Sequence, residues 1–61
     1  MELKPGEHYQ ETRTGREYVL LEIAEHATGQ VWVGFQNLAN KRMFTVVKEQ
    51  FERDFEIKTS P

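Results

Sequence analysis

Apolar residues fall at alternate positions on both sides of a short turn in the middle of the chain, between Tyr18 and Phe35. Alternation with a period of two is typical of β-strands, because successive side chains point to opposite faces of a sheet. Each arm places apolar residues on one face: Val19, Leu21 and Ile23 in the first arm, and Val31, Val33 and Phe35 in the second. The pattern predicts a β-hairpin with one shared apolar face, and this hairpin is the centre of the predicted fold.

The turn of this hairpin determines which residues lie opposite each other. A three-residue loop over 27–29 puts Gly29 where such a loop needs a left-handed backbone. A two-residue loop at Thr28 and Gly29 opposes Ile23 to Gly34, and a slip of one residue turns every side chain to the other face. The three-residue loop is therefore favoured. It predicts the pairs Ile23 with Val33, Leu21 with Phe35, and Ala24 with Trp32.

The first arm, residues 16–26, has an alternative interpretation as a helix, because leucine, glutamate and alanine are good helix formers. Its apolar residues do not form a stripe at helical spacing, and neither end carries a convincing capping box. Gly15 and Gly29 bracket the run. A strand is therefore favoured over a helix.

The residues before the hairpin predict a lead-in and a short edge strand. Pro5 cannot donate a hydrogen bond to a ladder and Pro-Gly is typical of a turn, so residues 1–6 are expected to form a lead-in. The segment His8–Thr12 is polar apart from Tyr9, which suits an edge strand that is guarded against association. A Thr-Gly turn then leads into the hairpin.

After the hairpin, the two asparagines within residues 37–42 indicate a turn. Phe44 and Val46 are expected to face the core from the strand that follows, and Phe51 from a helical turn. The remaining predicted elements are a strand over Arg42–Val47, a helical or 3₁₀ turn over Lys48–Glu52, a last short strand with Phe55 and Ile57, and a frayed tail over 59–61.

Five short strands joined by tight turns, with one helical turn before the last, predict an all-β fold, a small five-stranded SH3-like and partly closed barrel. A chain of 61 residues is expected to be a single domain, 1–61. Its core has to come from packing, since there is no cysteine for disulfides or thiolate metal sites. His8 and His26 are too few for a structural metal site. Catalysis by either needs a nucleophile or second base within reach and a pocket, and a barrel of this size offers little volume for one. No metal, cofactor or enzymatic activity is expected.

The charge balance is mildly acidic, with ten Asp and Glu against eight Lys and Arg. Broad attraction to nucleic acid needs a basic excess, so nucleic acid is the less favoured partner. No apolar run approaches the length of a membrane span, and the first ten residues lack the apolar core of a signal peptide. Together with the lack of cysteine, these features predict a cytoplasmic protein with no membrane partner.

The chain carries four motifs in order: Lys4-Pro5-Gly6, Tyr18–His26, Phe35-Gln36-Asn37-Leu38 and Met43–Phe51. They resemble a family of short bacterial and phage proteins known as a domain of unknown function, whose members read KPG-x-Y-x-H, Y-x-V-L-x-x-A-x-H, V-x-Y-Q-x-L and L-W-V-R-P-x-x-x-F. The chain has Val47-Lys48 where that pattern has Arg-Pro. The resemblance implies a small β-barrel and a structural role for His26, and it brings no known activity.

The face of the hairpin opposite the predicted core carries Tyr18, Leu20 and Trp32. Aromatic surfaces of this kind bind peptides or unstacked bases in other small domains. The alternative is that the termini or a second copy cover this face, because a small barrel needs both faces partly covered. We expect a protein partner to bind here, with Glu22 and Arg42 at the rim of the apolar centre.

The predicted function is therefore a non-enzymatic binding module that acts through protein–protein contacts, such as a phage or bacterial regulator or inhibitor of a host protein. The large apolar residues exceed what one small core can hide, which also predicts a homodimer. The alternative function is a nucleic-acid-associated barrel that uses Trp32, Lys41, Arg42 and Lys48. Acidic residues are interleaved with basic ones over 48–56, which weakens this alternative.

Overall fold

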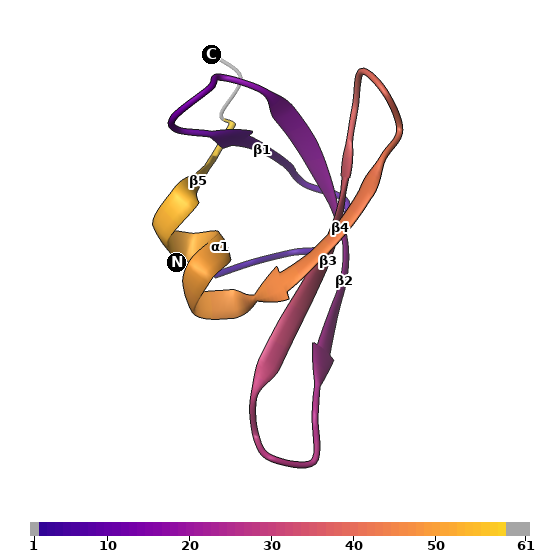
Figure 1. Ribbon diagram of the computed structural model, residues 1–61, viewed down its shortest axis with the longest axis vertical. Coiled ribbons are helices and arrows are strands. Elements are labelled where there is room, and N and C mark those ends of the chain that lie inside the picture. The colour runs from indigo at the N-terminus through magenta and orange to yellow at the C-terminus, as the bar shows by residue number, and fades with distance from the viewer. Residues whose placement is uncertain (1, 59–61) are drawn as a thin grey trace.

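Five antiparallel strands and one short helix make up the computed structural model, which describes residues 2–58 (Figure 1). The elements are β1 (His8–Glu11), β2 (Glu17–Glu25), β3 (Val31–Asn37), β4 (Met43–Val47), α1 (Lys48–Asp54) and β5 (Phe55–Ile57). They form one sheet in the order β4-β3-β2-β1-β5. The prediction of a small all-β SH3-like fold is confirmed, although the sheet is not closed, because β4 and β5 do not pair with each other. The predicted frayed tail, 59–61, lies outside the described residues.

The turn between β2 and β3 has the predicted three-residue geometry. The His26 N–H donates to the Gln30 carbonyl over 2.8 Å, and Gly29 has a φ of 84°. This left-handed backbone is the one that favours glycine. The predicted pairs of Ile23 with Val33 and Ala24 with Trp32 are both present.

A β-bulge in β2 changes which side chains reach the core. The register shifts between Leu20 and Glu22, so that Leu20 pairs with Phe35. The predicted pairing of Leu21 with Phe35 is therefore wrong, and Leu20 is only 1% exposed whereas Leu21 is 42% exposed. The extra residue inverts the faces of the strand on its N-terminal side, because side chains alternate with a period of two. Tyr18 and Leu20 therefore face the core.

Strand β1 is an inner strand and not the predicted edge strand. It pairs with β2 on one side and with β5 on the other. Tyr9 is fully buried in it, and its ring lies edge-on to that of Phe51 at a centroid distance of 5.3 Å. The polar residues around Tyr9 suggested an edge, but β5 returns along the outside of β1 and covers it.

Most of the core is aromatic. Phe51 is fully buried, and its ring stacks on that of Phe55 at 4.4 Å with an interplanar angle of 7°. Phe51 therefore packs against the sheet from the helix, as predicted, although α1 runs to Asp54. The buried apolar residues are Leu3, Tyr9, Tyr18, Leu20, Val33, Phe35, Phe51 and Phe55. Leu3 belongs to the predicted lead-in and nevertheless contributes to the core.

The far end of the β2–β3 hairpin projects beyond this core (Figure 1). All residues from 21 to 30 are exposed, including Ile23, which shares the inner face with its partner Val33. The described chain extends 36 Å along its longest axis and 23 and 20 Å along the others. Ile23 is exposed because β1, α1 and β5 cover only the other end of the hairpin.

The turn between β3 and β4 is held by asparagine side chains, as predicted. Asn37 is buried, and its Oδ1 accepts hydrogen bonds from the backbone N–H groups of Ala39 and Asn40 at 2.8 and 3.1 Å. Lys41 takes a left-handed backbone with a φ of 65°. This turn sets the register in which β4 follows β3.

Candidate functional site

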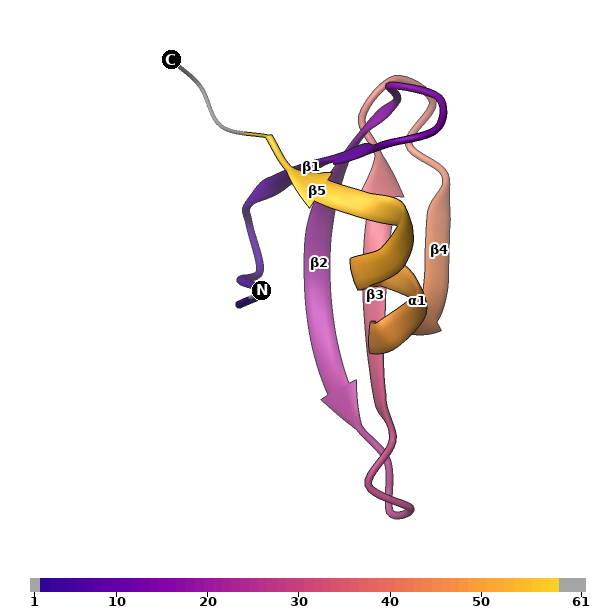
Figure 2. The same ribbon diagram turned by 90° about the vertical axis from the view of Figure 1, so that its left-hand side faces the viewer.

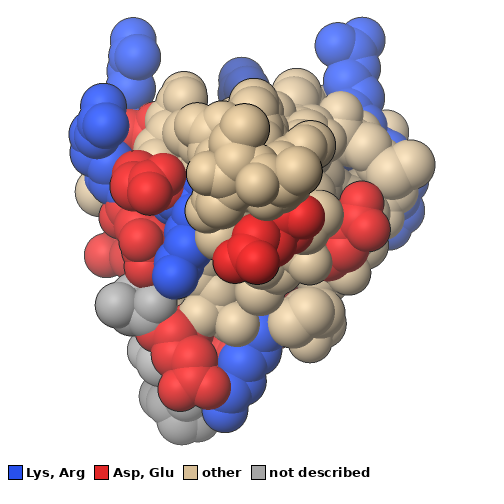
Figure 3. All heavy atoms as spheres, turned by 90° about the horizontal axis from the view of Figure 1, so that it is seen from below, with Lys and Arg blue, Asp and Glu red and all other residues tan. Residues whose placement is uncertain are grey.

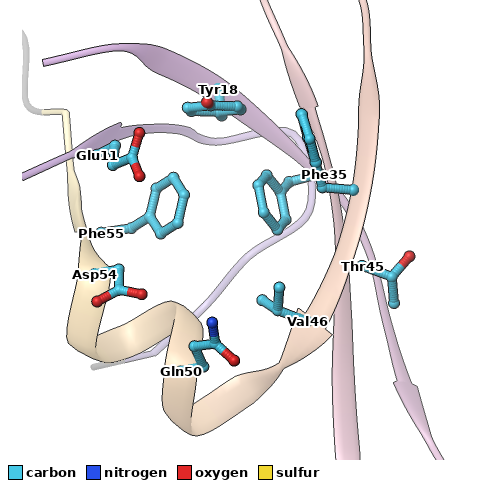
Figure 4. A pocket seen from close by; sticks show the side chains of 9 residues that line it. Glu11, Tyr18, Phe35, Thr45, Val46, Gln50, Asp54 and Phe55 are labelled. Atoms are coloured by element: carbon cyan, nitrogen blue, oxygen red, sulfur yellow. The ribbon is translucent and has the colours of Figure 1, made fainter. Parts of the chain in front are cut away.

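A pocket of about 240 Å³ opens between β4, α1 and β5 (Figure 4). It draws residues from all five strands and the helix. The residues that line it are Glu11, Tyr18, Phe35, Phe44, Thr45, Val46, Gln50, Asp54 and Phe55. This volume is below the roughly 300–1,000 Å³ of pockets that hold small-molecule ligands, so it suits a single side chain better than a whole metabolite.

The floor of this pocket is a cluster of aromatic rings. Figure 4 shows the side chains of Tyr18, Phe35 and Phe55 pointing toward one another from three strands. The ring of Tyr18 lies edge-on to Phe35 at 5.4 Å and to Phe55 at 5.2 Å. These three residues are buried, whereas Phe44, which stacks on Phe35 at 5.6 Å, is 41% exposed. Phe44 thus brings the aromatic cluster to the surface at the mouth of the pocket.

Two carboxylates lie at the rim. Glu11 ends β1 and Asp54 ends α1, and the Thr12 N–H donates to the Asp54 backbone carbonyl over 2.9 Å, which ties the two element ends together. The Thr14 hydroxyl donates to Glu11 Oε1 over 2.7 Å. The Asp54 carboxylate has no hydrogen-bond or ion-pair partner within the described chain. The mouth therefore combines exposed aromatic surface with negative charge.

Strand β4, which forms one wall of the pocket, is an edge of the sheet. In Figure 2 it lies on the outer side of β3, and no strand of the described chain pairs with its other side. Figure 4 shows the Thr45 side chain pointing away from the rings, so Thr45 lines the pocket with its backbone. The pocket therefore reaches the free edge of β4.

The hydrogen-bond pattern shows which backbone groups of β4 are free. At the closed end of the β3–β4 hairpin, the Asn37 N–H donates to the Arg42 carbonyl over 2.8 Å. Hydrogen-bonded and non-hydrogen-bonded pairs alternate along an antiparallel ladder. The bonded pairs are therefore Phe35 with Phe44 and Val33 with Val46. The backbone N–H groups of Met43, Thr45 and Val47 therefore face the free edge, together with the C=O groups of Met43 and Thr45. Val47 is the N-cap of α1, so its C=O belongs to the helix.

The structure does not bring the predicted partner-binding residues together. Tyr18 and Leu20 were placed on the outer face with Trp32, and this placement is wrong, because the bulge turns both into the core. Trp32 is half-buried on the outer face, where its ring lies 5.7 Å from that of His26. Glu22 lies opposite Gly34 on the same face.

Arg42 is far from the predicted rim of this surface. It lies at the turn beside Asn37, whereas Trp32 pairs with Val47 at the opposite end of β4. The residues of the nucleic-acid alternative are divided in the same way, with Lys48 next to Val47 and the Lys41–Arg42 pair at the other end. Figure 3, seen from below, shows acidic and basic side chains interleaved over this face, with acidic side chains near its middle. The basic residues of this alternative form no single surface.

The sequence interpretation missed Glu11, Asp54 and the exposed Phe44 as members of one site. Phe44 was expected as a core residue and Phe55 as part of the last strand. Asp54 was assigned to a solvated charge run, and Glu11 to a set of acidic residues on the first two strands. The register that pairs Glu11 with Phe55 brings β1 and β5 together from distant parts of the chain. No local pattern reports that pairing.

One ion pair links the strands on either side of β1. Lys58 Nζ lies 2.8 Å from Glu17 Oε1, and the hydrogen bond and charge of Lys58 hold the pKa of Glu17 below its ordinary value. The two side chains are 42% and 43% exposed, so this pair contributes little to stability. Between residues 2 and 58 no group of His, Asp and Glu side chains is placed to hold a metal ion. No helix in the described part of the chain is long and apolar enough to cross a membrane.

Comparison with protein-family models, with curated proteins and with solved structures found no match. The resemblance of the four sequence motifs to a family of short bacterial and phage proteins therefore stays a prediction.

Proposed function

We propose that this chain is a non-enzymatic binding module that takes up an extended segment of a protein partner as an added strand on β4. The observation that carries the proposal is the free β4 edge beside the aromatic pocket. An added strand gains affinity from main-chain hydrogen bonds, and side-chain pockets along the edge give it specificity. The β4 edge has free backbone groups for main-chain hydrogen bonds, and the pocket beside it can take up a side chain.

The lack of protection on β4 supports this role. Natural edge strands are blunted by lysine, proline, bulges or very short length. Strand β4 reads Met-Phe-Thr-Val-Val, without charge or proline, and Met43 is 69% exposed. The opposite edge, β5, has only three residues and carries Glu56 at its centre. An unguarded apolar edge on one side alone suggests that a partner covers it.

A second copy of this chain fits the β4 edge less well than a different protein. The antiparallel two-fold pairing of the whole strand is centred on Thr45. It brings Arg42 of one copy, just before β4, toward Lys48 of the other, just after β4. Like charges directly opposite each other destabilise a strand pair. The homodimer predicted from the apolar content therefore needs another surface, and light scattering over a range of concentrations tests it.

The partner-binding role is tested with a random-peptide display selection against the immobilised chain, followed by affinity measurements on the selected peptides. We expect Thr45→Pro to weaken binding by about tenfold or more, because it removes an outward N–H and blocks the edge. Proline is tolerated on edge strands, so the fold is expected to survive, as checked by circular dichroism. Thr45→Val keeps the N–H and the β-branched shape, and should bind like the wild type.

Met43→Pro provides a second variant if Thr45→Pro does not fold, because proline is accepted at the first residue of a strand. A selection that yields no peptide contradicts the proposal. So does a folded proline variant that binds the selected peptides as tightly as the wild type.

A further inference from the structure

Resting on the proposed strand addition, we infer that the partner inserts a cationic side chain, lysine or arginine, into the pocket between β4, α1 and β5. Three properties of the pocket suit a cationic side chain. These are aromatic surface, negative charge at the rim, and an apolar wall for the stem.

The aromatic surface attracts positive charge. The face of an aromatic ring carries partial negative charge, and a cation within about 6 Å of the ring centroid is stabilised by it. The exposed part of Phe44 and the buried rings behind it lie within one cluster, with Tyr18 and Phe44 at a centroid distance of 6.0 Å. A cation above this cluster contacts more than one ring.

The carboxylates at the rim select positive charge over neutral apolar groups. Glu11 and Asp54 are both partly buried and both line the pocket, together with the side-chain amide of Gln50. The Asp54 carboxylate has no hydrogen-bond or ion-pair partner within residues 2–58. No lysine or arginine lines this pocket, so the rim charge is not neutralised inside it. Arg13 and Arg53 line an adjacent hollow with the same two carboxylates, and neither forms an ion pair with them in the described chain.

The remaining wall suits the apolar stem of a long cationic side chain. Lysine and arginine lay their methylene groups along apolar surface while the charged head stays near water or a counter-charge. Val46 is packed against the core and lines the pocket next to Phe44. A stem that enters from the β4 edge passes over these two residues and brings the charged head toward the rings and the carboxylates.

The geometry of strand addition also restricts where the cation stands in the partner sequence. Side chains of the added strand that lie opposite Phe44 or Val46 point to the inner face, where the pocket opens, and the residue between them points outward. The basic residue is therefore expected at one of two positions that are separated by a single residue. Its neighbours on either side point to the outer surface, opposite Met43 and Thr45 in the first case and opposite Thr45 and Val47 in the second.

Other hollows of the described chain fit this occupant less well. A larger hollow lies between the turns at Gly15 and Asn40 and has a volume of about 640 Å³. It contains no aromatic side chain, and Arg16 lies among its lining residues. The pocket beside β4 alone combines rings, unneutralised carboxylates and a free strand edge among residues 2–58.

The experiment uses the peptides obtained from the display selection on the intact chain. We expect them to share a lysine or arginine, and replacement of that residue by norleucine, which keeps an apolar stem, to weaken binding by about tenfold or more. Asp54→Asn and Glu11→Gln should each weaken the lysine or arginine peptide several-fold and leave the norleucine peptide unchanged. Glu25→Gln, on the projecting hairpin, removes the same charge away from the pocket and is the matched control.

A titration of N-acetyl-lysine amide and N-acetyl-norleucine amide, followed by NMR of the aromatic side chains, tests the pocket without strand addition. We expect lysine-specific shifts of Phe44 and Phe55 that disappear in Asp54→Asn. Peptides that bind and depend on Thr45 but show no basic preference overturn the cationic assignment and leave the proposed function intact. If no peptide binds, the strand-addition proposal fails. A lysine-specific shift would then show only that the pocket binds a free cationic side chain.

Discussion

Replacing Phe51 by alanine is expected to remove most of the stability of this fold. The side chain is fully buried, and its ring contacts those of Tyr9, Phe35 and Phe55 at centroid distances of 5.3, 5.1 and 4.4 Å. Truncation of a buried phenylalanine costs about 3–5 kcal/mol. A chain of this length has a total stability of roughly 3–9 kcal/mol, so the loss is comparable to the whole. Urea unfolding followed by circular dichroism and Trp32 fluorescence measures it.

The control for this variant is Ile57→Ala, which truncates a large apolar side chain that is 41% exposed. We expect Ile57→Ala to cost less than about 1 kcal/mol, because only part of its surface leaves water on folding. Equal urea midpoints of unfolding for the two variants would show that Phe51 of α1 does not pack in the core.

Neighbouring leucines in β2 are expected to respond very differently to truncation. Leu20→Ala should cost about 2–5 kcal/mol, because Leu20 is only 1% exposed. Leu21→Ala should cost less than about 1 kcal/mol, because Leu21 is 42% exposed. The two variants remove the same atoms from adjacent positions, so each is the matched control of the other. Their free energies of unfolding, measured in urea, report which face of the strand lies in the core.

The opposite order would mean that the bulge is absent. A regular ladder continued from Ile23 opposite Val33 places Leu21 opposite Phe35, and Leu21 then occupies the core position. A costly Leu21→Ala with a tolerated Leu20→Ala would therefore contradict the register described for β2.

This pair of leucines also shows where the sequence stops specifying the fold. The run from Tyr18 to Ile23 has apolar residues at both even and odd positions. Tyr18 and Leu20 belong to one face of the strand, and Val19, Leu21 and Ile23 belong to the other. Alternation predicts a strand here but does not determine which set faces inward. The choice depends on tertiary packing, because Tyr18 contacts Phe35 and Phe55 only after β3 and β5 are in place.

Turns whose geometry depends on the side chains within them could be predicted from the sequence. Gly29 specifies the left-handed position of the hairpin loop, and the asparagines at 37 and 40 hold the next turn with their own side chains. The helical turn before the last strand and the burial of Phe51 also followed from the local pattern. The role of β1 was not predictable, because an inner and an edge position differ only by the return of β5 alongside it.

The candidate site was less predictable than the fold. The residues that line the pocket come from all five strands and α1, so most of them are distant from one another in sequence. Trp32 lies on the outer face, where the alternation placed it, but away from the aromatic cluster of the pocket. Rings from distant segments gather into a site only through the sheet order β4-β3-β2-β1-β5.

Amide hydrogen exchange along β4, with and without a peptide from the display selection, tests strand addition most directly. In the free protein we expect protection at Phe44 and Val46, which bond to β3, and fast exchange at Thr45 and Val47, which face the free edge. Bound peptide should slow exchange at Thr45 and Val47 to rates near those of their neighbours. Peptide binding that leaves these two amides in fast exchange would contradict strand addition on β4.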